Sequence, residues 1–177
     1  DHRSDTLDSG PAAQCHGAVF RAASRDDLVA LCELERAANL AALGHVFPPE
    51  RYPFPVDDVL ARWSIVLEDP DVAVMVAEEA GELVALAAYD SSTLRHLAVR
   101  PDRWGHGLAS SAVETVVHAL DLRGCTIASL WCLEENHRAR RLYEWLGWRP
   151  TNDRREAPWP PYPVELRYTR LIPQSDR

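Results

Sequence analysis

The order in which strand-like and helix-like segments follow one another most constrains what this chain can fold into. Apolar residues that alternate with polar ones, or form short runs, predict strands, whereas apolar residues three or four positions apart predict helices. From residue 17 onward the order is strand, two helices, three strands, helix, strand, helix and strand, with one more strand near Trp148. Strands and helices mixed in this way predict a three-layer α/β fold with helices on both faces of a central sheet.

Local signals set the boundaries of these elements. Ser24 and Asp27 form a capping box at the first helix, with aspartate in the place of glutamate, and Pro55 opens the second helix. Ala80 and Gly81 form the turn of a β-hairpin, and the proline-rich segment 148–163 is expected to be irregular apart from the strand near Trp148. The expected strands are 17–23, 72–79, 82–90, 91–100, 125–133 and 164–172, and the expected helices are 25–43, 56–70, 107–120 and 136–146.

Length and composition predict a single domain. The 177 residues suit one core of ordinary size, and no apolar run approaches the roughly 20 residues of a membrane span. Residues 1–16 are polar and lack an apolar signal region, so we expect a flexible tail there, a single domain over 17–177, and no export or membrane partner. The cysteines form no C-x-x-C pair and suit reduced residues of a cytoplasmic protein.

Charge and histidine spacing narrow the classes of partner. The net charge of −8 argues against a nucleic-acid partner. The seven histidines show no H-x-x-x-H or H-x-H spacing, so no metal site is expected.

The stretch VRPDRWGHGLAS, residues 99–110, joins an expected strand to an expected helix through Gly105 and Gly107. Glycine permits a tight turn and a close approach of a ligand, and a helix start offers unpaired N–H groups to an anion. The stretch lacks the third glycine of G-x-G-x-x-G and the G-K-[ST] of a P-loop. Two interpretations therefore stand: a phosphate cradle of another kind, or a tight turn without a ligand.

A second pattern is NHRARRLYEWLGW, residues 136–148. Asn136 follows a strand and is placed to cap the helix. Tyr143 lies two turns further along the same helix face, where it is either a core aromatic residue or a functional one. A buried tyrosine generally finds a polar partner for its hydroxyl.

Together the two stretches resemble the GNAT superfamily of N-acetyltransferases. That family carries hydrophobic-x-V-x-P-x-x-[QR]-G-x-G-x-[GA] after its fourth strand and N-x-x-A-x-x-L-Y-E-x-x-G-[FW] after its fifth. This chain reads LAVRPDRWGHGLA and NHRARRLYEWLGW at the corresponding places. One position departs from the pattern, because Trp104 stands where the family has glutamine or arginine.

The resemblance implies a GNAT-like fold, with a mixed sheet of about seven strands, and acetyl-CoA as co-substrate. It implies that backbone N–H groups at the glycine stretch hold the pyrophosphate, that the strand before it pairs with the pantetheine arm, and that Asn136 binds that arm. The coenzyme-binding residues implied in this way are Leu97, Ala98, Val99, Trp104, Gly105, His106, Gly107, Leu108, Ala109, Ser110, Asn136 and Ala139.

The implied reaction is direct attack of a neutral primary amine on the thioester, with Tyr143 as the acid for the leaving thiolate. No nucleophilic cysteine is required, and Cys132 has no histidine partner that would activate it.

The sequence does not assign the general base that takes the proton from the amine. The family's strand positions for a base hold Thr93 and Arg95 here, and neither serves as a base. His96 points to the opposite face of the strand. The alternatives are His45, in the loop between the first two expected helices, and ordered water.

The acceptor, a small-molecule or peptide amine, is expected between residues 44–55 and 151–163. The candidate contacts are His45, Phe47, Tyr52 and Trp159. The alternative interpretations are a buried or solvated loop histidine for His45, which is the more frequent case for a lone loop histidine, and packing of the loops themselves for the aromatic residues. The alternative functions are a catalytically silent coenzyme-A-binding module and the transfer of a longer acyl group. A monomer and a homodimer both fit the sequence.

Overall fold

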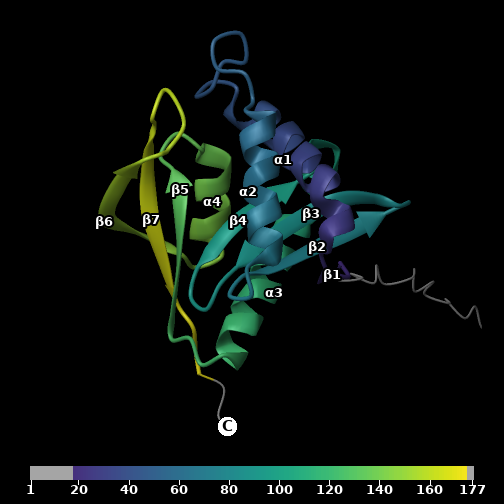
Figure 1. Cartoon of the computed structure of the whole chain (residues 1–177). Helices are drawn as coiled ribbons and strands as arrows, with labels where there is room; N and C mark the ends of the chain where they lie inside the picture. Colours follow the sequence, from purple (N-terminus) through teal and green to yellow (C-terminus); the bar gives the residue numbers. More distant parts are fainter. Residues whose placement is uncertain (1–17, 175–177) are drawn as a thin grey trace, which may run out of the picture.

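A computed structural model describes residues 18–174 of the chain (Figure 1). The expected tail at 1–16 and Cys15 lie outside these residues. The strands are β1 (Arg21–Ala22), β2 (Ala73–Glu79), β3 (Glu82–Tyr89), β4 (Leu94–Val99), β5 (Ile127–Leu133), β6 (Arg149–Glu156) and β7 (Val164–Leu171). The helices are α1 (Leu28–Leu43), α2 (Val56–Glu68), α3 (Leu108–Leu122) and α4 (His137–Trp145), with short 3₁₀ turns at Arg25–Asp27 and Pro101–Arg103.

The seven strands form two antiparallel sheets that meet at one point. The first sheet has the order β1-β2-β3-β4 and the second the order β5-β7-β6. They are joined where Thr93 and Ser129 form an isolated parallel bridge and the Ser129 N–H donates to the Ser92 carbonyl at 2.9 Å. Beyond this bridge β4 and β5 do not pair, so one edge of β4 carries backbone groups that have no strand partner among residues 18–174.

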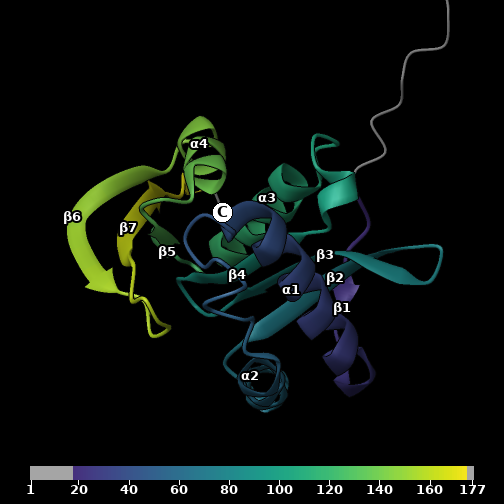
Figure 2. The ribbon, with the colours of Figure 1, turned by 90° about the horizontal axis from the view of Figure 1, so that it is seen from above.

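The helices form the two outer layers, as the sequence predicts. Figures 1 and 2 show α1 and α2 on one side of the strands and α3 and α4 on the other. On the α1–α2 side Trp63 is the largest fully buried side chain, and on the α3–α4 side Trp148 and Tyr168 take that role. Burial of aromatic side chains on both faces anchors the helices to the strands between them.

Several predicted turn and cap residues have the expected geometry. The Asp27 carboxylate accepts from the Ser24 backbone N–H at 2.7 Å, and the Asn136 side chain accepts from the Ala139 N–H at 3.2 Å. Ala80 and Gly81 have φ angles of 51° and 78° in the β2–β3 hairpin. Both central residues of a type I′ turn need such positive angles.

The strand predicted near Trp148 is present as β6, but it extends over residues 149–156, so the interpretation of the segment 148–163 as otherwise irregular is wrong for these residues. Among the described strands it pairs only with β7, and its register shifts between Pro150 and Arg154. Its side chains are almost all exposed, so it shows none of the apolar alternation by which a half-buried strand is predicted. Proline is tolerated near its start because β6 is an edge strand.

None of the helices in residues 18–174 is long and apolar enough to span a membrane.

Candidate functional site

A cavity of about 320 Å³ lies between β4, the start of α3, and α4, and we refer to it as the α3 cavity. The structure brings together here nearly all residues of the predicted coenzyme site. Those that line the cavity are Leu97, Ala98, Val99, Trp104, Gly105, Gly107, Leu108, Ala109, Ser110, Asn136 and Ala139. His106 does not line it, and its ring contacts the backbone carbonyls of Arg103 and Trp104 instead.

The start of α3 presents backbone N–H groups to this cavity. Gly105 and Gly107 have φ angles of 81° and 80°, in the left-handed region where any other residue is strained. The first helical acceptor is the Gly107 carbonyl, which receives the Ser111 N–H at 2.9 Å. The N–H groups of residues 108–110 come earlier in the chain than Ser111, so no carbonyl of the helix accepts from them. These N–H groups and the positive end of the helix dipole can both attract an anion.

The open edge of β4 forms a second wall. The Arg100 N–H donates to the Val84 carbonyl at 2.8 Å, so these two residues form a hydrogen-bonded pair between β3 and β4. In an antiparallel ladder, hydrogen-bonded pairs alternate with pairs that are not hydrogen-bonded. Leu97 and Val99 belong to the second kind, and they direct their backbone groups away from β3, toward the side where β4 has no strand partner. The Val99 carbonyl accepts the Trp104 indole N–H at 2.8 Å, which leaves the Leu97 groups and the Val99 N–H to meet an extended ligand.

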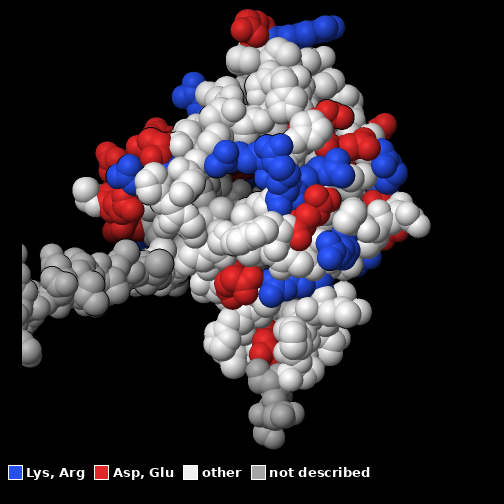
Figure 3. All heavy atoms as spheres, turned by 180° about the vertical axis from the view of Figure 1, so that it is seen from behind, with Lys and Arg blue, Asp and Glu red and all other residues white. Residues whose placement is uncertain are grey.

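Trp104 also supports a basic side chain. The Arg138 guanidinium lies 4.2 Å from the centre of the Trp104 ring, and both residues line the α3 cavity. Such stacking holds a cation over an aromatic face. Figure 3 views the molecule from behind Figure 1 and shows basic side chains gathered on this face, although the whole chain has a net charge of −8. The face suits an anionic ligand.

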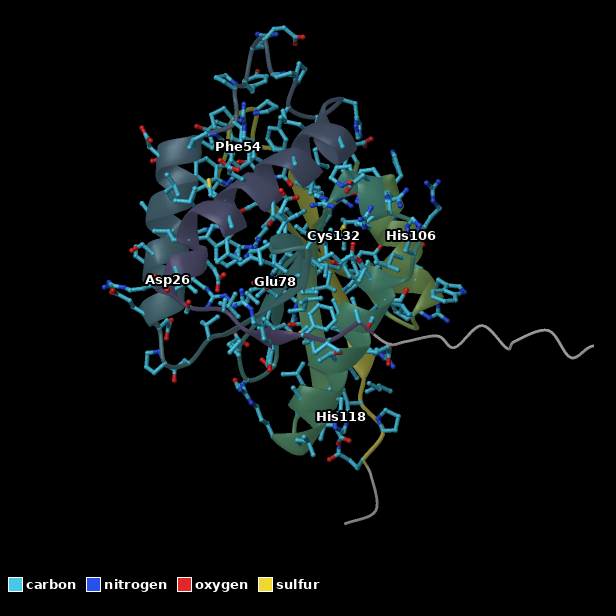
Figure 4. All side chains as sticks on the ribbon, turned by 90° about the vertical axis from the view of Figure 1, so that its right-hand side faces the viewer. Asp26, Phe54, Glu78, His106, His118 and Cys132 are labelled. Carbon is cyan, nitrogen blue, oxygen red and sulfur yellow. The ribbon has the colours of Figure 1, made fainter. Side chains whose placement is uncertain are left out.

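A second cavity, of about 240 Å³, lies between α1, α2 and the loops before α2 and after β6. We refer to it as the aromatic cavity, because Phe47, Tyr52, Phe54 and Trp159 line it. Figure 4 shows Phe54 beside the ends of α1 and α2, well away from His106. Three of the four predicted acceptor contacts thus lie together. The fourth, His45, lines neither cavity, and its Nε2 pairs with the Glu135 carbonyl at 2.8 Å.

Asn39 of α1 lines both cavities, so the two spaces adjoin at this residue. Glu35 stands one helical turn earlier on the same face of α1 and lines the aromatic cavity. An extended anionic ligand in the α3 cavity and a second ligand in the aromatic cavity would therefore meet beside Asn39. This arrangement suits transfer of a group between two bound molecules.

The family model described as the acetyltransferase (GNAT) family matches residues 28–148. This match covers more than half of the chain and includes α1, α3, α4 and both sequence patterns. The chain belongs to this acetyltransferase family. Comparison of the sequence with curated proteins finds no match.

Solved structures of GNAT acetyltransferases share the fold. The crystal structure of a GCN5-related N-acetyltransferase from Rhodopseudomonas palustris has a TM-score of 0.76 and 15% identity, covering 88% of this chain and 96% of that one. The ribosomal-protein-S18-alanine N-acetyltransferase from Escherichia coli has a TM-score of 0.67 and 21% identity, covering 90% and 96%. Spermidine N-acetyltransferase from Vibrio cholerae, solved with coenzyme A and spermine, has a TM-score of 0.65 and 18% identity, covering 89% and 97%.

In this GNAT chain Tyr143 lies behind the α3 cavity and lines neither of the two cavities. It is 7% exposed, packs edge-on against Trp148 at 6.1 Å and lies tilted against Tyr168 at 6.2 Å, measured between ring centres. Its neighbours Ala139 and Leu142 on α4 do line the α3 cavity. Burial raises the pKa of Tyr143 well above its ordinary value, so the hydroxyl stays protonated.

Burial also removes two other groups from proton or acyl transfer. It raises the pKa of the Cys132 thiol to about 12, so this side chain is no thiolate near neutral pH. Burial and the nearby Arg62 and Arg95 lower the pKa of His96 to about 3, and its ring packs 5.1 Å from Trp63 on the α1–α2 side. His96 thus lies on the opposite face of β4, as its position in the strand predicts.

Sequence reasoning missed the polar residues of the aromatic cavity, namely Glu35, Asn39, Arg51 and Arg62. Glu35 and Asn39 are four residues apart on a helix, and this spacing was the available signal that they share a face. Nothing in the sequence places Arg62 of α2 beside Glu35, because that contact depends on how the two helices pack.

Proposed function

We propose that this protein transfers an acetyl group from acetyl-CoA to a primary amine of a small molecule or peptide. Transfer is direct, within a complex that holds both substrates. The observation that carries the proposal is the meeting of the α3 cavity and the aromatic cavity at Asn39. The family match and the unpaired N–H groups at the start of α3 support acetyl-CoA as the ligand of the first cavity.

Each wall of the α3 cavity has a distinct task in this proposal. The N–H groups of residues 105–110 hold the pyrophosphate, and Ala109 is small enough to leave room for it. The open edge of β4 pairs with the pantetheine arm in the manner of an added strand. Since the Asn136 side-chain oxygen already caps α4, its amide NH₂ is the group that remains for the same arm.

Tyr143 does not itself line the α3 cavity, but it adjoins the lining residues Ala139 and Leu142, and in this proposal its hydroxyl reaches the thioester between them and assists the departure of the thiolate. Because burial raises its pKa, the phenol stays protonated and acts as a hydrogen-bond donor to the sulfur as negative charge develops there. A hydroxyl with so high a pKa stabilises the leaving group without fully giving up its proton. The proposal needs no acyl-enzyme, in keeping with the buried Cys132 thiol.

Deprotonation of the amine is assigned to ordered water. Thr93 and Arg95 occupy the strand positions where the family can carry a base, and neither accepts a proton. The Glu35 carboxylate, although it lines the aromatic cavity, is bound by Arg62 and by the Trp63 indole N–H. The lack of a base at those two strand positions favours one second candidate, a silent module that binds coenzyme A.

A screen of amines with acetyl-CoA separates these candidates. Release of free thiol is measured for aliphatic, aromatic and peptide amines, and the acetylated product is identified by mass. Acetyl transfer to any of them supports the enzyme. Tight binding of acetyl-CoA with no transfer to any amine supports the silent module instead. Parallel assays with longer acyl thioesters test whether the acyl pocket accepts more than acetyl.

Replacing Tyr143 with phenylalanine tests the proposed acid. The change removes one hydroxyl and keeps the ring that packs on Trp148 and Tyr168. We expect kcat and kcat/KM to fall together by about 10- to 100-fold, because the contact strengthens only in the transition state. Coenzyme affinity, measured by calorimetric titration of the same variant, should stay unchanged. Turnover within about twofold of the parent would remove Tyr143 from the mechanism and return it to the role of a core residue.

A further inference from the structure

The charged residues that line the aromatic cavity indicate which chemical class of acceptor it binds. The cavity wall contains one carboxylate, from Glu35, and two guanidinium groups, from Arg51 and Arg62. Its other members are mainly aromatic and aliphatic, with Asn39 at the junction to the α3 cavity. The lining is therefore net positive on a protein whose overall charge is −8.

The carboxylate in this wall already has partners. Arg62 forms an ion pair with Glu35, and the Trp63 indole N–H donates to the same oxygen at 2.7 Å. Arg62 is also held against the Trp63 ring at 5.2 Å, and its Nε is buried without an acceptor. A substrate ammonium group would have to compete with these donors for Glu35. Neither residue of this pair offers a free charge to a ligand.

Arg51 is the cation that remains. It is exposed, its guanidinium lies 5.6 Å from the centre of the Tyr52 ring, and no carboxylate pairs with it anywhere in residues 18–174. Stacking on Tyr52 limits the freedom of the side chain at the cavity wall, so less entropy is lost when an anion binds. Arginine recognises carboxylates through two parallel N–H donors.

We infer that the acceptor is an amine that also carries a carboxylate on an apolar or aromatic body, and that Arg51 binds this carboxylate. This inference rests on the proposed function and narrows its substrate class. The amine reaches the junction at Asn39, the body packs among Phe47, Tyr52 and Trp159, and the anion meets Arg51. A polyamine is a poor fit, because its second ammonium group would lose water in a largely apolar cavity. There it would also lie near Arg51, whose unpaired charge is positive as well.

Matched probes test the inference. Two pairs differ only in the carboxylate: L-phenylalanine with 2-phenylethylamine, and 4-(aminomethyl)benzoate with 4-methylbenzylamine. Spermidine serves as the polycation. Binding to the protein saturated with coenzyme A is measured by calorimetry, and turnover with acetyl-CoA by thiol release. In at least one pair we expect the carboxylate member to bind about tenfold more tightly than its uncharged partner. This factor is at the lower end of the range for a charge-assisted hydrogen bond, because Arg51 is exposed to solvent. Spermidine should bind more weakly than that member.

Variants assign the preference to a residue. Arg51→Gln should bring the two members of the preferred pair within about twofold of each other, and Arg51→Lys should keep part of the difference. Arg36→Gln is the matched control, because Arg36 is exposed on α1 and lines neither cavity. Melting curves of all three variants check that folding is intact.

The outcomes separate the two proposals. Equal or tighter binding of the uncharged members in both pairs, or a preference that survives Arg51→Gln, overturns the inference. Acetylation of those uncharged amines would still support the proposed function. A preference that depends on Arg51 without turnover of any probe would support the inferred ligand class and contradict acetyl transfer.

Discussion

Burial decides which single residues near the two cavities can exchange protons. Tyr143 and Cys132 both have raised pKa values because their charged forms lose solvation, whereas His96 has a lowered one for the same reason. All three are therefore neutral near pH 7. In the proposed reaction this leaves Tyr143 as a donor, excludes Cys132 as a nucleophile, and excludes His96 as a base.

The lowered pKa of His96 has a consequence for stability. In the unfolded chain His96 takes up a proton near its ordinary pKa of about 6.5, whereas in the folded protein it does so only near pH 3. Between these values the unfolded state binds more protons, so the stability that neutral His96 contributes is lost as pH falls. We expect the free energy of unfolding to decrease below pH 6.5 by up to about 1.4 kcal/mol per pH unit from this group.

Denaturant unfolding at a series of pH values measures this effect. His96→Gln should flatten the dependence between pH 6.5 and 4, because glutamine takes up no proton. His118→Gln is the control, since His118 is exposed on α3. An equally steep loss of stability in His96→Gln and the parent would show that His96 is not the group responsible.

At the scale of elements, the start of α3 depends on backbone shape. Gly107 lies immediately before the helix with a φ angle of 80°, and added side-chain atoms would meet nothing within 4 Å. The glycine is therefore required for conformation and not for lack of space. Its angle sets the direction in which the following N–H groups face the α3 cavity.

Gly107→Ala should cost about 1–2 kcal/mol of stability through backbone strain. We expect it also to weaken acetyl-CoA binding, because the N–H groups turn as the strain relaxes. Gly81→Ala is the matched control, with a φ angle of 78° and equally open surroundings in the β2–β3 hairpin. It should lose similar stability and keep its coenzyme affinity. Equal coenzyme affinity in both variants would place the anion site elsewhere.

The elements that the sequence predicts well are those with local signals. The Ala80–Gly81 turn, the Asn136 cap and the apolar face of α3 are each set by neighbouring residues, and all have the expected form. The length of strand β6 has no such signal: the sequence predicts only a strand near Trp148, because the exposed edge strand over residues 149–156 is specified by its pairing with β7. The polar wall of the aromatic cavity was missed for a similar reason, since the contact of Arg62 with Glu35 joins residues of two helices.

At the scale of the whole molecule, the α3 cavity joins the two sheets. Its walls come from β4, at the edge of the four-stranded sheet, and from α4, which follows β5 of the three-stranded sheet. The sheets themselves meet in residues 18–174 only at the bridge between Thr93 and Ser129. A ligand that fills the cavity therefore adds contacts between parts of the fold that share few hydrogen bonds, and it should stabilise the folded state.

Thermal unfolding with and without acetyl-CoA tests the central claim, that the α3 cavity is the coenzyme site of an acetyltransferase. At about 100 times the dissociation constant, acetyl-CoA should add about 2.7 kcal/mol of stability, or about 5–10 °C in Tm for a chain of this size. Ala109→Glu places a carboxylate where the pyrophosphate is proposed to bind. It should melt near the parent's Tm without ligand and lose most of the shift. An unchanged Tm of the parent at millimolar acetyl-CoA, or an equal shift in Ala109→Glu, would contradict the account.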